Sequence, residues 1–268
     1  MMHEPPAAIR VRVDPANPGQ FFACCGLLEL ADRLWSSAEG WFEDSSFHLR
    51  TVDRSAQNPT LASLIAAIAQ APLRAVDAND ETASPIQIET PFHLRLDWWN
   101  DQRSGGDRLK VWAGRMSSVR ISRAMQHAIA LQVRRDETLL DEGLVVYDPD
   151  DATKKVEPFY FDARRGSNAR SLDIGFAPDA FGMTTLAYPA VELLCLIGIQ
   201  RARPAPTAAK RVFHYFTWGV PLPPIGAGCA AYGNLEVALD HAYEFEVGFR
   251  TDQRKHKAFM PATRIVRR

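Results

Sequence analysis

The alternation of apolar and polar residues along the chain predicts strands and helices in mixed order. Apolar and basic residues alternate in Ile9–Val13 and again in Phe92–Leu96, as is typical of half-buried strands. Asn17 is a good N-cap with Pro18 at the first helical position, so a helix is expected to follow. The same patterns predict helices at about 19–34, 60–71, 117–134 and 188–200, and strands at about 41–49, 144–147, 156–161, 212–218 and 243–250.

This order of elements predicts an α+β fold with mixed antiparallel sheets and packed helices, because it has no regular βαβ units and no dinucleotide-binding fingerprint. The Pro- and Gly-rich segment Gly219–Gly233 is predicted to be a flexible connection between two strands. For its part Gly226–Gly233, a phosphate cradle of backbone N–H groups is the alternative. Residues 1–268 are expected to form a single compact unit. Two closely packed lobes, an acidic one at about 1–101 and a basic one at 102–268, are the alternative.

Charge is unevenly distributed, although the formal net charge is only −1. Residues 1–101 hold seven Lys/Arg against fourteen Asp/Glu, whereas residues 103–135 hold eight basic side chains against one acid. Such blocks create local fields that suit anion binding or docking onto another protein. In the predicted 117–134 helix, Arg120 and Arg123 share a face with Gln126 and, with Arg115 just before it, can follow a phosphate backbone; an ordinary solvated face is the alternative.

The segment Asp162–Ser171 is the clearest candidate binding site. Arg164 and Arg165 precede a Gly-Ser-Asn turn, and Arg170 follows it. Guanidinium groups match phosphate oxygens bidentately, and small residues between them let the backbone come close. The segment therefore predicts a surface loop that binds nucleic acid, and a solvated basic turn neutralised by neighbouring aspartates is the alternative.

Catalytic signatures are few. The seven histidines are dispersed, with no metal-binding pair. His214 is the candidate base of a metal-independent RNA-cleaving site, and an ordinary strand histidine is the alternative. Asp148–Asp151 either binds a divalent ion or forms a turn. We therefore favour a protein that is not an enzyme and has no metal and no small-molecule cofactor.

Cysteine usage and hydropathy indicate an intracellular protein. Cys24, Cys25, Cys195 and Cys229 form no CxxC pair and are expected to be buried, reduced thiols. No apolar run reaches the roughly 18 residues that a membrane span needs, and the N-terminal residues lack a signal pattern. We expect a cytoplasmic protein without membrane contact.

Three longer stretches resemble one protein family. They are Asn17–Trp35 with the following Ala38–Phe42, then Phe159–Phe176, and Pro189–Pro204. They resemble proteins that are encoded beside subtype I-U (also called I-G) CRISPR effector genes. Within that group, the resemblance is to the third member of the Csb series. The resemblance implies a bacterial cytosolic protein of antiviral defence that works with or within an RNA-guided DNA-targeting complex. In such complexes base pairing reads the sequence and the protein holds the backbone.

The resemblance implies neighbouring effector subunits and guide RNA or target DNA as partners. By analogy with other CRISPR backbone and RNA-processing subunits, it also suggests a ferredoxin-like module. The function expected from residues and resemblance together is that of a non-enzymatic subunit or accessory protein that contacts nucleic acid. A metal-independent guide-RNA-processing endoribonuclease and a purely protein–protein adaptor are the alternatives.

Overall fold

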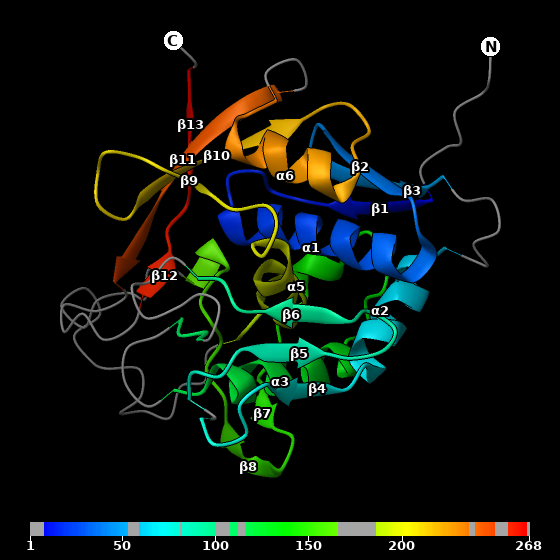
Figure 1. Cartoon of the computed structure of the whole chain (residues 1–268), viewed down its shortest axis with the longest axis vertical. Helices are drawn as coiled ribbons and strands as arrows, with labels where there is room; N and C mark the ends of the chain where they lie inside the picture. Colours follow the sequence, from blue (N-terminus) through cyan, green and yellow to red (C-terminus); the bar gives the residue numbers. More distant parts are fainter. Residues whose placement is uncertain are drawn as a thin grey trace.

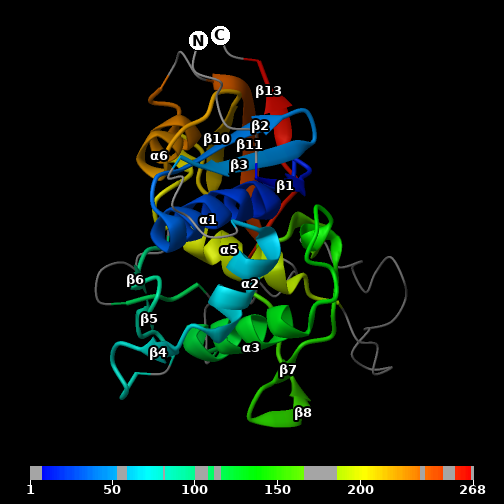
Figure 2. The same ribbon diagram turned by 90° about the vertical axis from the view of Figure 1, so that its right-hand side faces the viewer.

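A computed structural model describes residues 8–52, 59–80, 82–99, 108–111, 116–165, 186–235, 239–249 and 257–266. The predicted α+β class is confirmed, because helices pack against antiparallel sheets throughout these ranges. Helices α1 (Pro18–Trp35) and α5 (Pro189–Gly198) lie at the centre, with sheets on both sides (Figures 1 and 2).

Helix α1 begins where the sequence predicts and is buried along most of its length. The Asn17 side chain accepts hydrogen bonds from the backbone N–H groups of Gly19 and Gln20, at 3.1 and 3.4 Å. These bonds satisfy donors that the first turn of a helix leaves unpaired. Every residue from Pro18 to Ala31 is buried, so α1 is the central element of the core.

Helices α1 and α5 approach each other at two glycines. A Cβ atom on Gly26 would lie 2.0 Å from the carbonyl oxygen of Leu194, and one on Gly198 would lie 1.9 Å from that of Phe22. Because real Cβ atoms do not come so close to a carbonyl oxygen, the distance between the helices depends on both glycines.

A three-stranded antiparallel sheet packs its apolar face on α1. It consists of β1 (Ile9–Arg12), β3 (Ser46–Thr51) and β2 (Ala38–Glu43), in that order. The predicted single strand at 41–49 is therefore a hairpin, which turns at Asp44 with φ 51°. The βαββ order and the β1-β3-β2 pairing match the first half of a ferredoxin-like module. Among the described residues no fourth strand extends this sheet on the β1 side, because β4 pairs with β5 instead.

The second sheet is also antiparallel and has the order β9 (Ala205–Pro206), β10 (Val212–Trp218), β11 (Leu239–Phe249) and β12 (Lys257–Phe259), with β13 (Thr263–Ile265) also on β11. Its inner face joins α1 through an aromatic cluster. Phe21 lies 4.4 Å from Tyr215 and 5.2 Å from Phe42 between ring centroids. The indole N–H of Trp218 donates to the Gly40 carbonyl at 2.8 Å, which ties the second sheet to the first.

The segment predicted as a flexible connection, Gly219–Gly233, contains helix α6 (Pro224–Tyr232). Pro224 occupies the first turn, and Gly233 ends the helix in the left-handed region at φ 94°. Ala227, Ala230 and Ala231 are buried on its inner face. This burial stabilises a helix in a segment whose glycines and prolines favour a loop, so the prediction was wrong.

A second group of elements lies on the other side of α5 (Figure 1). It comprises α2 (Leu61–Gln70), the sheet β4 (Leu73–Ala75), β5 (Ile86–Ile88) and β6 (Leu94–Leu96), and helix α3 (Ser118–Leu131). Gln126 was assigned to the outer face of this last helix, but its amide donates to the carbonyls of Ile68 and Ala71 at 2.8 and 2.7 Å. Gln126 thus joins α3 to the end of α2.

The hairpin of β7 (Tyr147–Asp148) and β8 (Asp151–Lys155) projects from the end of the structure opposite β13 (Figures 1 and 2). The segment 156–161, predicted as a strand, has no regular secondary structure. Its aromatic residues are buried, and Tyr160 has φ 61°. The 3-10 turns Leu139–Asp141 and Ala163–Arg165 complete the described elements.

Candidate nucleic-acid interface

Arg164 is held by the protein itself. Its guanidinium donates to the Asp162 carboxylate at 2.9 and 2.6 Å and to the Leu140 carbonyl at 2.7 Å. It also lies 3.4 Å from Asp141 and 3.5 Å from the centre of the Tyr188 ring. Burial alone would lower the pKa of Arg164, but the bonds to Asp162 outweigh it and raise the pKa. In these contacts Arg164 is a structural cation whose donors are used within the protein.

The other predicted arginines of this loop lie outside the described residues. Arg165 belongs to the 3-10 turn, but its side chain is not described, and Arg170 falls in the undescribed range 166–185. Arg115 falls in the range 112–115, which is also outside the description. The proposed three-arginine loop therefore stays a prediction for these positions.

Described parts of the stretches at 17–42, 159–176 and 189–204 meet at a buried polar cluster. The Asn17 amide donates to Asp162 at 3.0 Å, and its oxygen accepts from the Ala163 N–H at 3.0 Å. Glu192, on α5, accepts from the N–H groups of Phe161 and Asp162, both at 3.2 Å. Asp162 and Glu192 are fully buried, so their hydrogen bonds fix the three stretches to one another. These bonds thus join the start of α1, the 161–163 segment and α5 within the core.

A hollow of about 580 Å³ lies between the start of α3 and strand β8. Three cations and one carboxylate line it: Arg120, Lys154, Lys155 and Glu157. Its apolar lining is formed by Met116, Ile121 and Val156. The lining therefore combines an excess of positive charge with an apolar surface.

Arg120 also lines a smaller hollow of about 230 Å³, together with Arg123 and the carboxylates of Asp148 and Asp150. Nε and Nη2 of Arg120 both contact Asp148, and its side chain is 52% exposed. Among the described residues Nη1 makes no hydrogen bond. A hydrogen bond from the Asp150 N–H, together with Arg120, holds the pKa of Asp148 below its ordinary value. The ion pair with Asp148 thus orients the Arg120 guanidinium and leaves its Nη1 donors available to a ligand.

Arg123 is the other predicted α3 residue that the structure places here. Its polar contact among the described residues is a 3.4 Å hydrogen bond to the Leu73 carbonyl. Lys154 and Lys155 were missed, because a Lys-Lys pair after an Asp-rich turn is a common surface pattern. Their significance comes from the hairpin, which places them opposite α3.

The candidate catalytic residue His214 and the candidate metal ligands at Asp148–Asp151 each have an ordinary structural contact in the described part of the chain. His214 Nε2 lies 2.9 Å from Glu244 Oε2, directly opposite on the neighbouring strand, as in an ordinary cross-strand pair. Asp148 is engaged by Arg120, and the described residues contain no group of three His, Cys, Asp or Glu side chains that could hold a metal. No helix in the described ranges is long and apolar enough to span a membrane.

The cysteine prediction is confirmed at three positions and wrong at one. Cys24, Cys25 and Cys195 are buried free thiols, and burial raises the pKa of each. Cys229 is exposed, because it lies on the outer face of α6.

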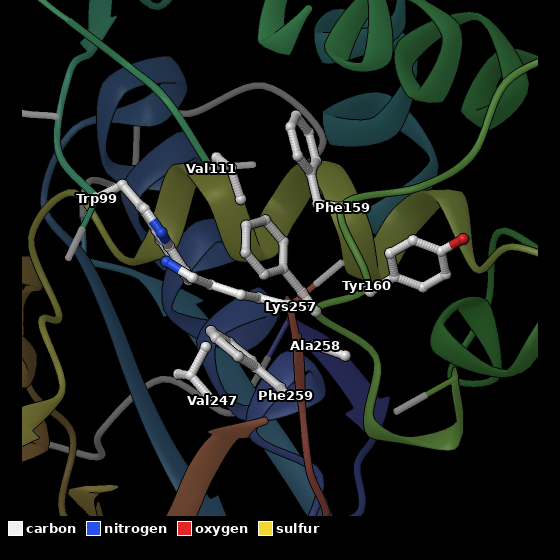
Figure 3. Close-up of a pocket in the computed structure, with 9 residues that line it drawn as sticks. Trp99, Val111, Phe159, Tyr160, Val247, Lys257, Ala258 and Phe259 are labelled. Atoms are coloured by element: carbon white, nitrogen blue, oxygen red, sulfur yellow. The ribbon is translucent and has the colours of Figure 1, made fainter. Parts of the chain in front are cut away.

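An aromatic crevice beside the 156–161 segment is too narrow for a ligand (Figure 3). Trp99 and Phe259 stack at 5.6 Å between ring centroids, and Phe161 contacts both. The side chains leave no room for a water-sized sphere. This crevice is part of the hydrophobic core.

A further hollow of about 430 Å³ lies between the β2–β3 hairpin and strands β10 and β11, and it is acidic. Asp44 and Asp240 line it and have no hydrogen-bonding or ion-pair partner among the described residues. Glu43 pairs with His48 at 3.3 Å, but burial lowers the pKa of His48, so this histidine is neutral at neutral pH. The molecule thus has a hollow lined by three cations and one carboxylate at α3–β8, and another at β2–β10 whose lining includes three carboxylates, Glu43, Asp44 and Asp240.

Comparisons with protein-family models, with curated proteins and with solved structures found no match to this chain.

Proposed function

We propose that this protein is a non-enzymatic subunit or accessory protein of a subtype I-U (I-G) CRISPR interference system. In this proposal it contacts guide RNA or target nucleic acid and other effector subunits. The CRISPR context rests on the resemblance of the stretches at 17–42, 159–176 and 189–204. The observation that supports nucleic-acid contact is the α3–β8 hollow, where three cations and one carboxylate face the same space.

Arg120 and Lys154 each pair with an aspartate, but both can still contact a phosphate. Lys154 bonds Asp151 at 2.8 Å while its side chain is 63% exposed. Exposed ion pairs contribute only about 0–1 kcal/mol, so a phosphate competes readily for the ammonium group. Arg120 keeps donors that Asp148 does not use. Phosphate contacts of this kind position a nucleic acid without reading its sequence.

The test is binding of a fluorescein-labelled guide-length RNA to the purified protein over a salt series. We expect the logarithm of affinity to fall linearly with the logarithm of salt concentration, because phosphate contacts release counterions. The double variant Lys154→Gln/Lys155→Gln is expected to bind about tenfold more weakly and to reduce the slope by about one for each lysine. The control is Arg74→Gln/Lys210→Gln, which removes two exposed cations from other surfaces.

Each alternative has its own outcome in this experiment. If RNA binds but is recovered as discrete fragments, and His214→Ala abolishes them, the endoribonuclease alternative is correct. If no RNA binds at any salt concentration, the nucleic-acid proposal fails. Stoichiometric co-purification with effector subunits that survives nuclease treatment would then favour the adaptor alternative. The acidic hollow at Asp44 and Asp240 supports that second function, because it suits a basic side chain of a protein partner.

A further inference from the structure

Part of the α3–β8 hollow is lined by apolar side chains, which a phosphate group cannot cover favourably. A ligand that fills the hollow should therefore have an apolar surface as well as phosphates. Ile121 is 2% exposed and belongs to the core, and Met116 and Val156 pack against that core. A duplex presents phosphates and sugars to a protein surface, and its bases are stacked inside. An unstacked base, in contrast, has an apolar face that can cover Met116 and Val156.

The size of the hollow agrees with a base and its sugar-phosphate. Its volume of about 580 Å³ falls within the range of about 300–1,000 Å³ that is usual for small-ligand sites. The smaller hollow of about 230 Å³ shares Ser117 and Arg120 with it. The two adjoining spaces can therefore hold successive parts of one strand on either side of Arg120.

Arg120 has the geometry for stacking. Two of its nitrogens contact Asp148, whose carboxylate also accepts from the Asp150 N–H at 3.0 Å. This second bond fixes the carboxylate, and the carboxylate fixes the plane of the guanidinium. A planar guanidinium can stack on a base while it donates to a phosphate or a base edge in its own plane, whereas a lysine ammonium donates as a point charge and cannot stack.

We propose that the α3–β8 hollow binds single-stranded nucleic acid, with an unstacked base on Met116 and Val156 beside the Arg120 guanidinium and the adjoining phosphates near Lys154 and Lys155. This inference rests on the proposed function and specifies its ligand. Duplexes bind more weakly, because their bases cannot enter the hollow.

The test compares three fluorescein-labelled 12-nucleotide RNAs by anisotropy: a single strand, the same strand in a duplex, and a strand with several abasic sites. Since base stacking contributes about tenfold per base, we expect the plain single strand to bind at least about tenfold more tightly than either of the others. The substitution Arg120→Lys keeps the positive charge but removes the planar guanidinium that can stack on a base. It is expected to remove most of this preference while leaving the salt dependence unchanged.

The control variant is Arg74→Lys, at an exposed arginine that also pairs with a carboxylate, Glu89. It should preserve the preference for single strands. If duplex and abasic RNA bind the wild-type protein as tightly as the plain strand, the inference is overturned while the proposed function stands. If none of the three binds at low salt, both are overturned. The comparison of the three RNAs needs only the wild-type protein, so misfolding of a variant does not affect it.

Discussion

Glu29 shows how a single buried carboxylate is held in its charged form. Its side chain is 5% exposed and accepts from Arg201 at 2.6 and 3.1 Å and from Arg33 at 2.7 Å. Burial alone would raise the pKa of Glu29, but the two arginines more than offset it, so the pKa lies below its ordinary value. Because Arg201 lies three residues after the end of α5, this ion pair joins α1 to the turn that follows α5.

The depressed pKa predicts how stability depends on pH. Above the ordinary glutamate pKa of about 4.3, the ionised Glu29 stabilises the folded state, and this contribution is lost as pH falls through the lower folded-state pKa. Glu29→Gln should therefore be clearly less stable than wild type at pH 7, and the difference should shrink toward pH 3. Urea unfolding of both proteins at several pH values measures it. A difference that is independent of pH would show that the glutamate contributes packing and no charge.

At the scale of elements, glycines decide where helices touch. A Cβ atom added to Gly26 or Gly198 would come within 2.0 Å of a backbone carbonyl oxygen on the opposite helix. A Cβ atom added to Gly226, on α6, would meet no described atom closer than 3.5 Å, so it would make only ordinary van der Waals contacts. The same residue type thus permits close packing between α1 and α5 and has no such role at Gly226.

This contrast gives opposite predictions for one substitution. Gly26→Ala or Gly198→Ala should destabilise the protein by about 3 kcal/mol or more, because the two helices must separate to admit the methyl group. Gly226→Ala should stabilise it by about 0.5–1 kcal/mol, because alanine favours the helix and meets only ordinary contacts. Chemical denaturation of the three variants measures these differences. Equal effects at all three positions would contradict the close approach of α1 and α5.

At the scale of the whole molecule, both halves of the sequence contribute to one core. Helix α1 packs on α5, and the indole of Trp218 donates to the carbonyl of Gly40 in the first sheet. Leu222 also forms a β-bridge with Gly40. Neither the segment 1–101 nor the segment 102–268 keeps its packing without the other.

We therefore expect one unfolding transition for the whole chain. In scanning calorimetry, the calorimetric and van't Hoff enthalpies should agree, as they do for two-state unfolding. The Trp218→Phe substitution, which removes the bond to Gly40, should lower the midpoint without splitting the transition. Two separate transitions would instead support two independent lobes.

Sequence patterns predicted most of the elements because hydrophobic periodicity reflects burial. Asn17, Pro18 and the apolar run after them define α1, and the helix at 118–131 lies within its predicted range. Predictions failed where tertiary packing overrode local preference. Helix α6 forms from a Gly- and Pro-rich segment because its alanine face is buried. The segment 156–161 is not a strand, because its three consecutive aromatic side chains, Phe159, Tyr160 and Phe161, are all buried, whereas a strand would point them alternately to opposite faces.

The sequence by itself determined the fold class, the central helices and the presence of basic strips, since each depends on residue type and local spacing. Only the tertiary structure decided how the charges are used. Both Arg164 and Arg120 pair with aspartates, but the Arg164 side chain is 33% exposed and also bonds the Leu140 carbonyl. The Arg120 side chain is 52% exposed and lines a hollow together with Lys154 and Lys155. The reason is physical: electrostatic interaction depends on distance in space, and the chain pattern gives only distance along the sequence.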